Sequence, residues 1–477
     1  VVSFALAFAY RKFAVLPQSA PLRKRAPSFI ALLALCVLSF YGLKHDYAEI
    51  SQNRYVNEIA RNGVYELFSA YRNNELDYNH FYLTRPKEEV ADFLREKTGA
   101  GAGTASPLEH FVQNPKTKKR YNLMFVTVES LSAELLTMFG EERGLTPNLD
   151  KLVDQSMFFT NLYATGRRTV YGLSALTLAM PPIPGNSIVR RPDNGNLSSI
   201  GHVLRIQGYD TKFIYGGYGY FDNMNTFFAA NGYTIVDRNN MAKNEVHFAN
   251  VWGVADDDLF RKAMKEADAS YATGKPFFNM VMTTSNHRPY TYPEGKIDLP
   301  SGSGRKGGVK YTDYALGYLI DEAKKHPWFK DTIFVIVADH THGTSGKSDL
   351  DPDKYHIPMW IYAPGIIKPS KVDTFASQID VVPTVLGVMG ISYDSRFFGK
   401  DIRNEKPGRA FISNYQKLGY MTKDGVVILQ PVNEALFLKK NEIGEWVQQD
   451  NVPDQMLNEA IGYYQGASEW RNWSRAE

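Results

Sequence analysis

Two carboxylates and an imidazole in this sequence have the types and positions needed to bind a divalent metal ion. Glu129 follows an apolar run at 122–128, and Asp339 and His340 follow another at 332–338. Carboxylate oxygens and an imidazole nitrogen suit Mn²⁺, Zn²⁺ or Mg²⁺ and do not suit a site that requires thiolates. A single acidic residue after a strand is more often a helix cap, so the prediction of a metal site depends on these residues meeting at one place.

Thr169 is the candidate for a fourth ligand and for a nucleophile. It follows a Gly-Arg-Arg loop and begins a helical run in GRRTVYGLSALTLAMPP (166–182). A helix N-terminus favours an anionic phosphate through its free amides and its dipole. A hydroxyl beside a metal ion becomes a stronger nucleophile, and covalent catalysis through it would divide a phosphoryl transfer into two displacements. The alternative is that Thr169 is only a helix N-cap.

The elements that must bring these residues together are predicted from five short apolar runs separated by segments of helical periodicity. The runs are NLMFVTV (122–128), TKFIY (211–215), PFFNMVMT (276–283), TIFVIVA (332–338) and IPMWIYA (357–363). This alternation is typical of an α/β fold with a largely parallel sheet sandwiched between helices. In such a sheet the carboxyl ends of the strands line the ligand crevice, so the candidate ligands should converge there.

The first 45 residues have the pattern of membrane segments. Residues 1–10 and 29–43 are almost wholly apolar, and Arg23, Lys24 and Arg25 lie between them. The second run is short for the roughly 20 residues that a membrane helix needs, and a buried soluble helix is the alternative. The positive-inside rule predicts a cytoplasmic basic loop and an extracytoplasmic remainder. Because the sequence starts within an apolar run and without Met, we expect a fragment of a polytopic protein.

The rest of the chain predicts three further parts. We expect linker helices over 46–120, a catalytic domain over 121–396, and a small C-terminal antiparallel subdomain over 397–477, where short hairpin-like pieces replace the alternating pattern. The 54 basic and 51 acidic residues give a net charge of +3, which excludes a nucleic-acid partner held by charge. The single cysteine, Cys36, excludes an internal disulfide and a Cys-rich zinc site.

The chain resembles the lipoteichoic acid synthase branch of the alkaline phosphatase and sulfatase superfamily over roughly residues 121–400. The motifs that carry the resemblance are VESLSAELL, GRRTVYGL, TTSNHRPY, ADHTHG, HIPMWIYAPG and SQIDVVPTVLGVMG. The resemblance implies that one metal ion, usually manganese with magnesium or zinc as alternatives, is bound by Glu129, Thr169, Asp339 and His340. It also implies that Thr169 is the nucleophile and that His287 contacts the substrate.

One loop departs from the pattern of that branch. The segment YGGYGYFDNMNTFF places Asp222 and Met224 where the family has a Trp and an Arg that contact the glycerol phosphate. The head-group pocket has therefore changed, and Asp222 and Arg168 are predicted substrate contacts. Arg190 and Arg191, in IPGNSIVRRP, either meet lipid phosphates or are solvated surface arginines.

Three other residues have alternative interpretations. His342 and His356 could complete a second metal site. Alternatively, His342 could orient a ligand, and His356 could be a strand-edge residue before Ile357. Asp380 is interpreted as a structural cap for the helix that follows it.

We therefore expect a membrane-anchored, metal-dependent phosphoglycerol transferase at the bacterial cell membrane, with its catalytic domain outside the cytoplasm. It would move glycerol phosphate from phosphatidylglycerol, through Thr169, to a glycan or glycerolipid acceptor. A phosphoethanolamine transferase or a phosphodiesterase is the alternative, although the former typically carries several disulfides. Sulfate-ester hydrolysis is disfavoured because position 169 is Thr and not a precursor of formylglycine. An inactive sensor or scaffold is the alternative from another class.

Overall fold

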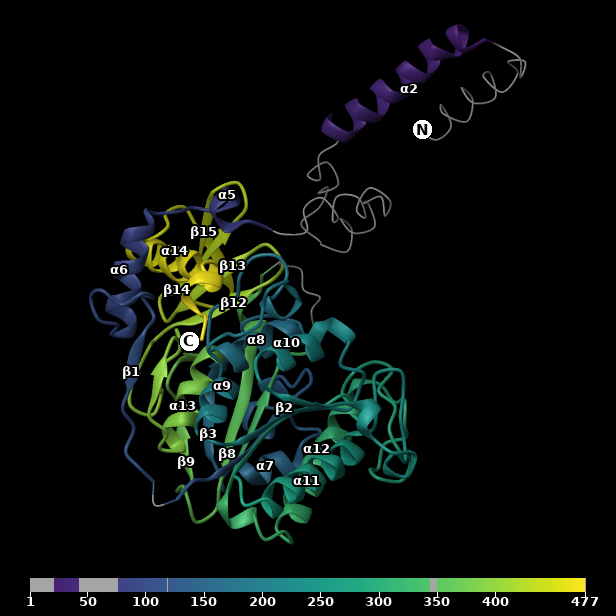
Figure 1. Cartoon of the computed structure of the whole chain (residues 1–477), viewed down its shortest axis with the longest axis vertical. Helices are drawn as coiled ribbons and strands as arrows, with labels where there is room; N and C mark the ends of the chain where they lie inside the picture. The colour runs from purple at the N-terminus through teal and green to yellow at the C-terminus, as the bar shows by residue number, and fades with distance from the viewer. Residues whose placement is uncertain (1–20, 43–75, 118, 344–349, 477) are drawn as a thin grey trace. The chain divides into compact units, whose positions relative to one another are not determined.

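The computed structural model (Figure 1) describes four stretches of the chain: residues 21–42, 76–117, 119–343 and 350–476. The chain divides into two compact units, Val1–Arg72 and Asn73–Glu477. The predicted apolar segment 1–10 and the first part of the predicted linker, 46–75, lie outside the described residues.

Helix α2 (Leu22–Gly42) contains most of the second predicted apolar segment. Pro27 lies inside this helix, close to its basic first turn. Several large apolar side chains of α2 are exposed, Phe29 at 65% and Leu38 at 69% among them. No helix among the described residues combines the length and the apolar character needed to cross a membrane. The predicted membrane helix is therefore not confirmed.

Nine strands of the described residues form the central sheet, in the order β10-β3-β8-β7-β2-β6-β4-β5, with β9 paired to β3. Their bounds are β2 Asn122–Val128, β3 Met157–Tyr163, β4 Asp210–Tyr215, β5 Thr234–Val236, β6 Phe277–Met282, β7 Thr332–Ala338, β8 His356–Tyr362, β9 Ser370–Val372 and β10 Ala376–Ser377. All of these strands run in one direction except β8, which is antiparallel to β3 and β7. The sheet is largely parallel, as predicted, but it is mixed.

The five predicted strands correspond to β2, β4, β6, β7 and β8, and the direction of β8 corrects the prediction. A parallel connection needs a crossover, usually a helix that covers the sheet. Between β7 and β8 the described residues contain only a short 3-10 helix, Pro352–Tyr355, so the chain turns back beside β7. Strand β3 is missing from the prediction because its sequence, MFFTNLY, mixes buried and partly exposed residues instead of forming one apolar run.

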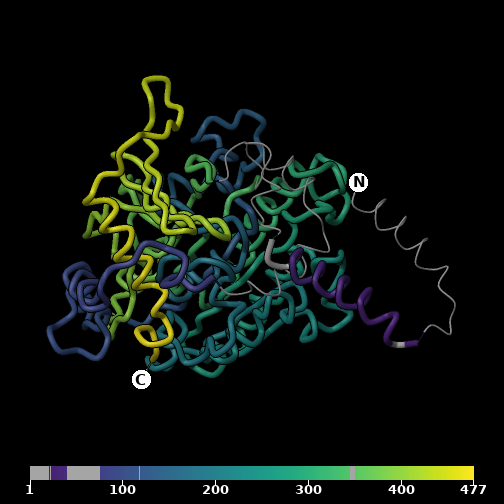
Figure 2. Tube along the Cα trace, turned by 90° about the horizontal axis from the view of Figure 1, so that it is seen from above, coloured from purple at the N-terminus to yellow at the C-terminus, as the bar shows by residue number. Residues whose placement is uncertain are grey.

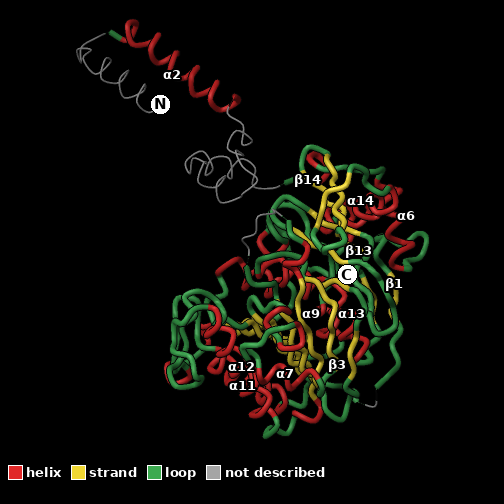
Figure 3. Tube along the Cα trace, turned by 180° about the vertical axis from the view of Figure 1, so that it is seen from behind, coloured by secondary structure: helices red, strands yellow, loops and turns green. Residues whose placement is uncertain are grey.

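Helices cover both faces of this sheet, as predicted. Figures 1 and 3 show α7, α11 and α12 together on one side and α9 and α13 on the other. Helix α8 packs against α9 and α13, and α10 packs against β5. The bounds of these helices are α7 Pro147–Val153, α8 Thr169–Leu178, α9 Ile200–Ile206, α10 Met224–Ala230, α11 Asp256–Ala272, α12 Arg305–Ala323 and α13 Val381–Val388. Strands β2 and β7, at the centre, are buried along their whole length.

A second, five-stranded antiparallel sheet lies near the C-terminus, as predicted. Its strands follow one another in sequence order, and Figure 2 shows the hairpin of its last two strands projecting from the body. Helix α14 packs against two of the strands and is followed by the short helix α15. The bounds are β12 Ala410–Ser413, β13 Leu418–Thr422, β14 Gly425–Gln430, β15 Glu434–Lys440, β16 Trp446–Gln449, α14 Asp454–Ser468 and α15 Trp470–Trp473.

The segment before β2 packs onto the C-terminal region. It comprises α5 (Tyr78–Phe81), α6 (Lys87–Thr98) and β1 (His110–Val112), which pairs with β11 (Tyr393–Ser395). Helix α6 carries acidic residues in its first turn, ends at Gly99 in the left-handed conformation, and packs against α14. The predicted boundaries between linker, catalytic domain and C-terminal subdomain remain predictions.

Candidate active site

The predicted ligands meet at the carboxyl edge of the two central strands. Strands β2 and β7 are parallel neighbours with Val128 opposite Ala338, so the residues that follow them meet at one edge. Ligand atoms of Glu129, Asp339 and His340 lie within 4.8 Å of one another, and all three residues are buried. The topology thus produces the convergence that the strand pattern predicts.

Ser130 determines which carboxylate oxygens remain available in this cluster. Its hydroxyl donates to Oε1 of Glu129 at 2.6 Å, and its backbone N–H donates to Oδ1 of Asp339 at 2.8 Å. Ser130 makes both contacts from a left-handed backbone conformation, with φ of 53°. Such a conformation is uncommon for a residue with a side chain, and it points to a functional constraint. The oxygens left over are Oε2 of Glu129 and Oδ2 of Asp339.

Thr169 completes the cluster from the first residue of α8. Its hydroxyl donates to Oε2 of Glu129 at 3.2 Å. The N-cap position of α8 belongs to Arg168, so Thr169 is not the helix cap of the alternative interpretation. Further along α8, a Cβ atom on Gly172 would overlap the carbonyl oxygen of Asp339, so the helix backbone rests directly on the chain that carries the ligands.

The imidazole of His340 is oriented by its own loop. Nδ1 lies 2.7 Å from the carbonyl oxygen of Thr341, which accepts its proton and leaves Nε2 to face the carboxylates. Nε2 is 3.4 Å from Oδ2 of Asp339 and 3.5 Å from Oε1 of Glu129. This arrangement presents an imidazole nitrogen to the same space as the free carboxylate oxygens.

The three groups shift one another's pKa values. Burial alone would raise the pKa of Glu129, but the hydrogen bond and positive charge of His340, with the Ser130 hydroxyl, lower it. Burial and the charge of Glu129 raise the pKa of Asp339. Burial would lower the pKa of His340, but the charges of Asp339 and Glu129 raise it. The shifts arise because two carboxylates and an imidazole share one buried space, where each group responds to the charge of the others.

These residues fit a divalent metal ion. Among the described residues, Oδ2 of Asp339 is buried and accepts no hydrogen bond. An unpartnered buried carboxylate oxygen is costly, and a bound cation would supply its partner. Two carboxylates, an imidazole and a hydroxyl are ligands that Mn²⁺, Mg²⁺ or Zn²⁺ accept.

His287 lies on the loop after β6, beside the cluster. Backbone amides of this loop, those of Thr284 and Ser285, donate to Asp256 at 2.9 and 3.1 Å. The His287 ring packs on Trp252 with centroids 3.8 Å apart, and its charge helps to lower the pKa of Glu129. The sequence analysis does not identify Trp252, because no local pattern connects it to a histidine 35 positions away.

The remaining predicted contacts meet on the other side of Thr169. Asp222 lies 3.8 Å from Arg168 and 3.5 Å from Arg190, so these predicted substrate contacts are ion-paired to each other. Met224 is buried, and it offers no polar contact in place of the family's Arg. Arg191 is also buried, and it donates to two backbone carbonyls, which corrects its interpretation as a solvated arginine.

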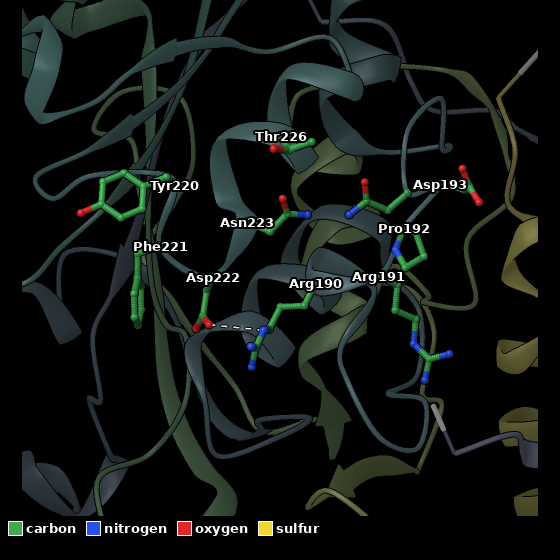
Figure 4. A pocket seen from close by; sticks show the side chains of 10 residues that line it. Arg190, Arg191, Pro192, Asp193, Tyr220, Phe221, Asp222, Asn223 and Thr226 are labelled. Atoms are coloured by element: carbon green, nitrogen blue, oxygen red, sulfur yellow. Dashed lines mark ion pairs between the residues drawn. The ribbon is translucent and has the colours of Figure 1, made fainter. Parts of the chain in front are cut away.

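A groove of about 800 Å³ opens at these arginines. Figure 4 shows Arg190 and Asp222 pointing toward one another inside it. The lining residues are Arg190, Arg191, Pro192, Asp193, Asn194, Tyr220, Phe221, Asp222, Asn223 and Thr226.

The two histidines considered for a second metal site, His342 and His356, make hydrogen bonds within the protein. His342 lies 2.6 Å from the Ser132 hydroxyl, and His356 lies 2.8 Å from the carbonyl oxygen of Thr160 at the start of β8. Among the described residues, the cluster of Glu129, Asp339 and His340 is the one group that could hold a metal ion, so nothing there supports a second site.

The fold is of the type found in the alkaline phosphatase superfamily. A solved protein of that superfamily from Vibrio parahaemolyticus is 34% identical, covers 83% of this chain and 99% of its own, and has a TM-score of 0.78. Residues 121–391 match the sulfatase family, and the chain belongs to this family.

Relatives by sequence confirm the resemblance to lipoteichoic acid synthases. Lipoteichoic acid synthase 2 from Bacillus subtilis is 26% identical over 60% of this chain and 47% of its own length. Phosphoglycerol transferase I from Xanthomonas campestris is 26% identical over 64% of this chain and 46% of its own. The chain therefore spans about half the length of these relatives. The lipoteichoic acid synthase LtaP from Listeria monocytogenes shares the fold, with 20% identity, a TM-score of 0.65, and coverage of 81% of this chain and 99% of its own.

Proposed function

We propose that this chain is a metal-dependent phosphoglycerol transferase that works through a covalent intermediate on Thr169. The observation that carries the proposal is the contact of the Thr169 hydroxyl with Glu129 at 3.2 Å, inside a buried cluster that retains a carboxylate oxygen without a hydrogen bond. A hydroxyl without metal-ligating neighbours would have no such means of activation. The intact cluster also argues against an inactive sensor or scaffold.

The residues divide the work of the reaction. A divalent ion held by Glu129, Thr169, Asp339 and His340, manganese being our proposal, would lower the pKa of the threonine hydroxyl and offset charge on the phosphate. The N-terminus of α8 directs amides toward the same phosphate. His287 lies where it can contact the transferred group or give a proton to the leaving alcohol.

The transfer proceeds in two balanced displacements. In the first, Thr169 Oγ1 forms a bond to phosphorus, the bond from phosphorus to the diacylglycerol oxygen breaks, and that oxygen takes up a proton as the threonine loses one. In the second, a hydroxyl of the acceptor attacks phosphorus and loses its proton, while the threonine oxygen leaves and regains one. Phosphoglycerol is thereby exchanged between two alcohols without net consumption of water.

The proposed donor is phosphatidylglycerol and the proposed acceptor is a glycan or a glycerolipid. The names of the relatives, lipoteichoic acid synthase and phosphoglycerol transferase, support the transferred phosphoglycerol group, and the resemblance of the motifs supports this donor and acceptor. We further propose that the chain acts at the bacterial cell membrane with its catalytic part outside the cytoplasm, because a lipid donor is confined to a membrane. Anchoring beside the donor would raise its effective concentration.

The test is incubation of the full chain with vesicles of phosphatidylglycerol, phosphatidylethanolamine or phosphatidylcholine in the presence of Mn²⁺. Mass spectrometry should find a phosphoglycerol adduct on Thr169 with the first lipid. Thr169→Ala should give none, whereas Thr273→Ala, at an exposed position after α11, should behave as the unmodified chain. An adduct from the ethanolamine lipid would support the alternative transferase. Lipid cleavage by Thr169→Ala would indicate a phosphodiesterase instead.

A further inference from the structure

Asp222 has an unusual position between two arginines beside the nucleophile. Its carboxylate oxygens lie 3.8 Å from Arg168 Nη2 and 3.5 Å from Arg190 Nε, and the two arginines are 22 positions apart in the chain. Figure 4 shows the pair with Arg190. Asp222 adopts a left-handed backbone conformation with φ of 52°, as does Asn223 with φ of 64°. Asp and Asn adopt this region more readily than other residues with a side chain, so the turn suits these two residue types.

The carboxylate acts through its charge more than through fixed hydrogen bonds. Separations of 3.5 and 3.8 Å are longer than hydrogen bonds between charged groups. Among the described contacts, Asp222 accepts no hydrogen bond, and the loop is tied to the neighbouring turn by Asn223, whose amide donates to the carbonyl of Val189 at 2.9 Å. The fold of the loop therefore does not depend on the Asp222 carboxylate.

The two arginines remain open to a ligand. The Arg168 and Arg190 side chains are 57% and 38% exposed, while that of Asp222 is only 10% exposed. Within the described residues, the side-chain contacts of both guanidiniums are their ion pairs with Asp222, and Arg190 lines the groove. Without the Asp222 carboxylate, the two arginines would carry a net charge of +2. With it, the net charge of the three side chains is +1.

Asp222 also lies within electrostatic reach of the metal cluster. Burial raises the pKa of the Tyr215 phenol, and the negative charges of Glu129, Asp222 and Asp339 raise it further. Tyr215 is the last residue of β4, so Asp222 and two carboxylates of the metal cluster act on the same phenol. Arg168 immediately precedes Thr169 in sequence, so one of the two arginines paired with Asp222 is the chain neighbour of the proposed nucleophile.

We propose that Asp222 is a specificity-determining residue that selects singly charged phosphodiesters over doubly charged phosphomonoesters. This inference rests on the proposed function, because it assumes that a phosphate ester binds at Thr169. A phosphodiester carries one negative charge, and a phosphomonoester carries two near neutral pH. Because Coulomb energy is proportional to charge, the Asp222 carboxylate opposes a doubly charged monoester about twice as strongly as a singly charged diester. The selected class includes phospholipid donors, and it excludes the phosphomonoesters that a more positive site would attract.

The test compares two chromogenic substrates that differ in charge. Hydrolysis of bis(p-nitrophenyl) phosphate and p-nitrophenyl phosphate by the full chain with Mn²⁺ gives kcat/KM for each. In Asp222→Asn the ratio of the monoester kcat/KM to the diester kcat/KM should rise about tenfold. This is the size of effect expected when one partly buried negative charge is removed beside the substrate. In the double variant Asp222→Asn with Arg190→Gln most of this rise should disappear, because the net charge returns to its original value.

A matched control and a binding measurement keep the inference separate from the proposed function. Asp331, paired with Lys119 at the opposite end of β7, lies roughly 25 Å along the strand from Asp339, and Asp331→Asn should leave the ratio unchanged. NMR titration with methyl phosphate and dimethyl phosphate measures the same selectivity without turnover. A ratio unchanged in Asp222→Asn by both measurements overturns the inference, even if phosphatidylglycerol forms the adduct. The expected shift in binding without any lipid transfer would support it and contradict the proposed donor.

Discussion

Removal of the Ser130 hydroxyl tests how the metal cluster is built. In Ser130→Ala the backbone N–H still donates to Asp339, but Oε1 of Glu129 loses the donor that lies 2.6 Å away. The Glu129 carboxylate is then free to rotate, and its Oε2 atom is no longer held toward the proposed metal site. In Ser130→Gly the same hydroxyl is lost, but the left-handed backbone at φ of 53° is relieved of its steric cost.

The magnitudes separate the two variants. A hydrogen bond to a charged group contributes about 1.5–3 kcal/mol, and loss of a residue that orients a metal ligand lowers metal affinity about 10- to 100-fold. Both variants should show this loss in Mn²⁺ affinity. The left-handed conformation costs a residue with a Cβ roughly 1–2 kcal/mol, so Ser130→Gly should be more stable than Ser130→Ala by about 1 kcal/mol.

Two measurements distinguish positioning from folding. Isothermal titration of the metal-free chain with Mn²⁺ gives the affinity, and urea unfolding without metal gives the free energy of unfolding. If Ser130→Gly binds Mn²⁺ as tightly as the unmodified chain, the hydroxyl does not orient Glu129 and the argument is wrong. Equal stability of the two variants would show instead that the backbone at this position carries no strain.

Four further results are expected. Thr169→Ala should abolish transfer of labelled phosphoglycerol, while Thr169→Ser should retain part of it, because serine keeps the hydroxyl and loses only the methyl that fixes its rotamer. His287→Ala should still bind Mn²⁺ in calorimetry but lose turnover by roughly 10²- to 10⁴-fold, since its position suits proton transfer or contact with the substrate. Arg409→Met should lower the free energy of unfolding in urea by about 3–5 kcal/mol, because it leaves Asp380 buried without the guanidinium that now donates to it at 2.7 and 2.9 Å. Burial raises the pKa of Asp313 from 3.8 to about 6. The folded state thus holds that proton more tightly than the unfolded chain, stability should fall as pH rises through this range, and Asp313→Asn should remove that fall.

The sheet and the metal cluster could be predicted because they depend on short patterns. Continuous apolar runs identify β2 and β7, and the parallel arrangement of two such strands places the residues that follow them side by side. Glu129, Asp339 and His340 meet for this reason alone. Asp380 occupies the N-cap position of α13, as predicted, but its carboxylate accepts hydrogen bonds from Arg409 and from the backbone N–H of Ser377 instead of capping the helix.

The contacts around the cluster could not be predicted, because loops join residues that share no periodic pattern. Ser130 links both carboxylates only through a left-handed backbone, which an isolated Glu-Ser pair does not signal. Trp252 reaches His287 through the packing of two loops. Asp222 forms an ion pair with Arg190, which lies 32 positions earlier in the chain. Each of these contacts requires tertiary packing that the sequence pattern does not encode locally.

The close approach of Gly172 to Asp339 makes the position of α8 independent of the side chain at its first residue. Because Gly172 has no Cβ, the helix backbone contacts the backbone of Asp339 directly. A substitution at position 169 would therefore replace the nucleophilic atom and leave α8 in place. Serine or cysteine there would face the same carboxylates from the same place. A larger residue at 172 would push the whole helix outward and separate any nucleophile from the ligands. The fold therefore tolerates different nucleophiles at position 169 but does not tolerate a side chain at position 172, one turn further along the helix.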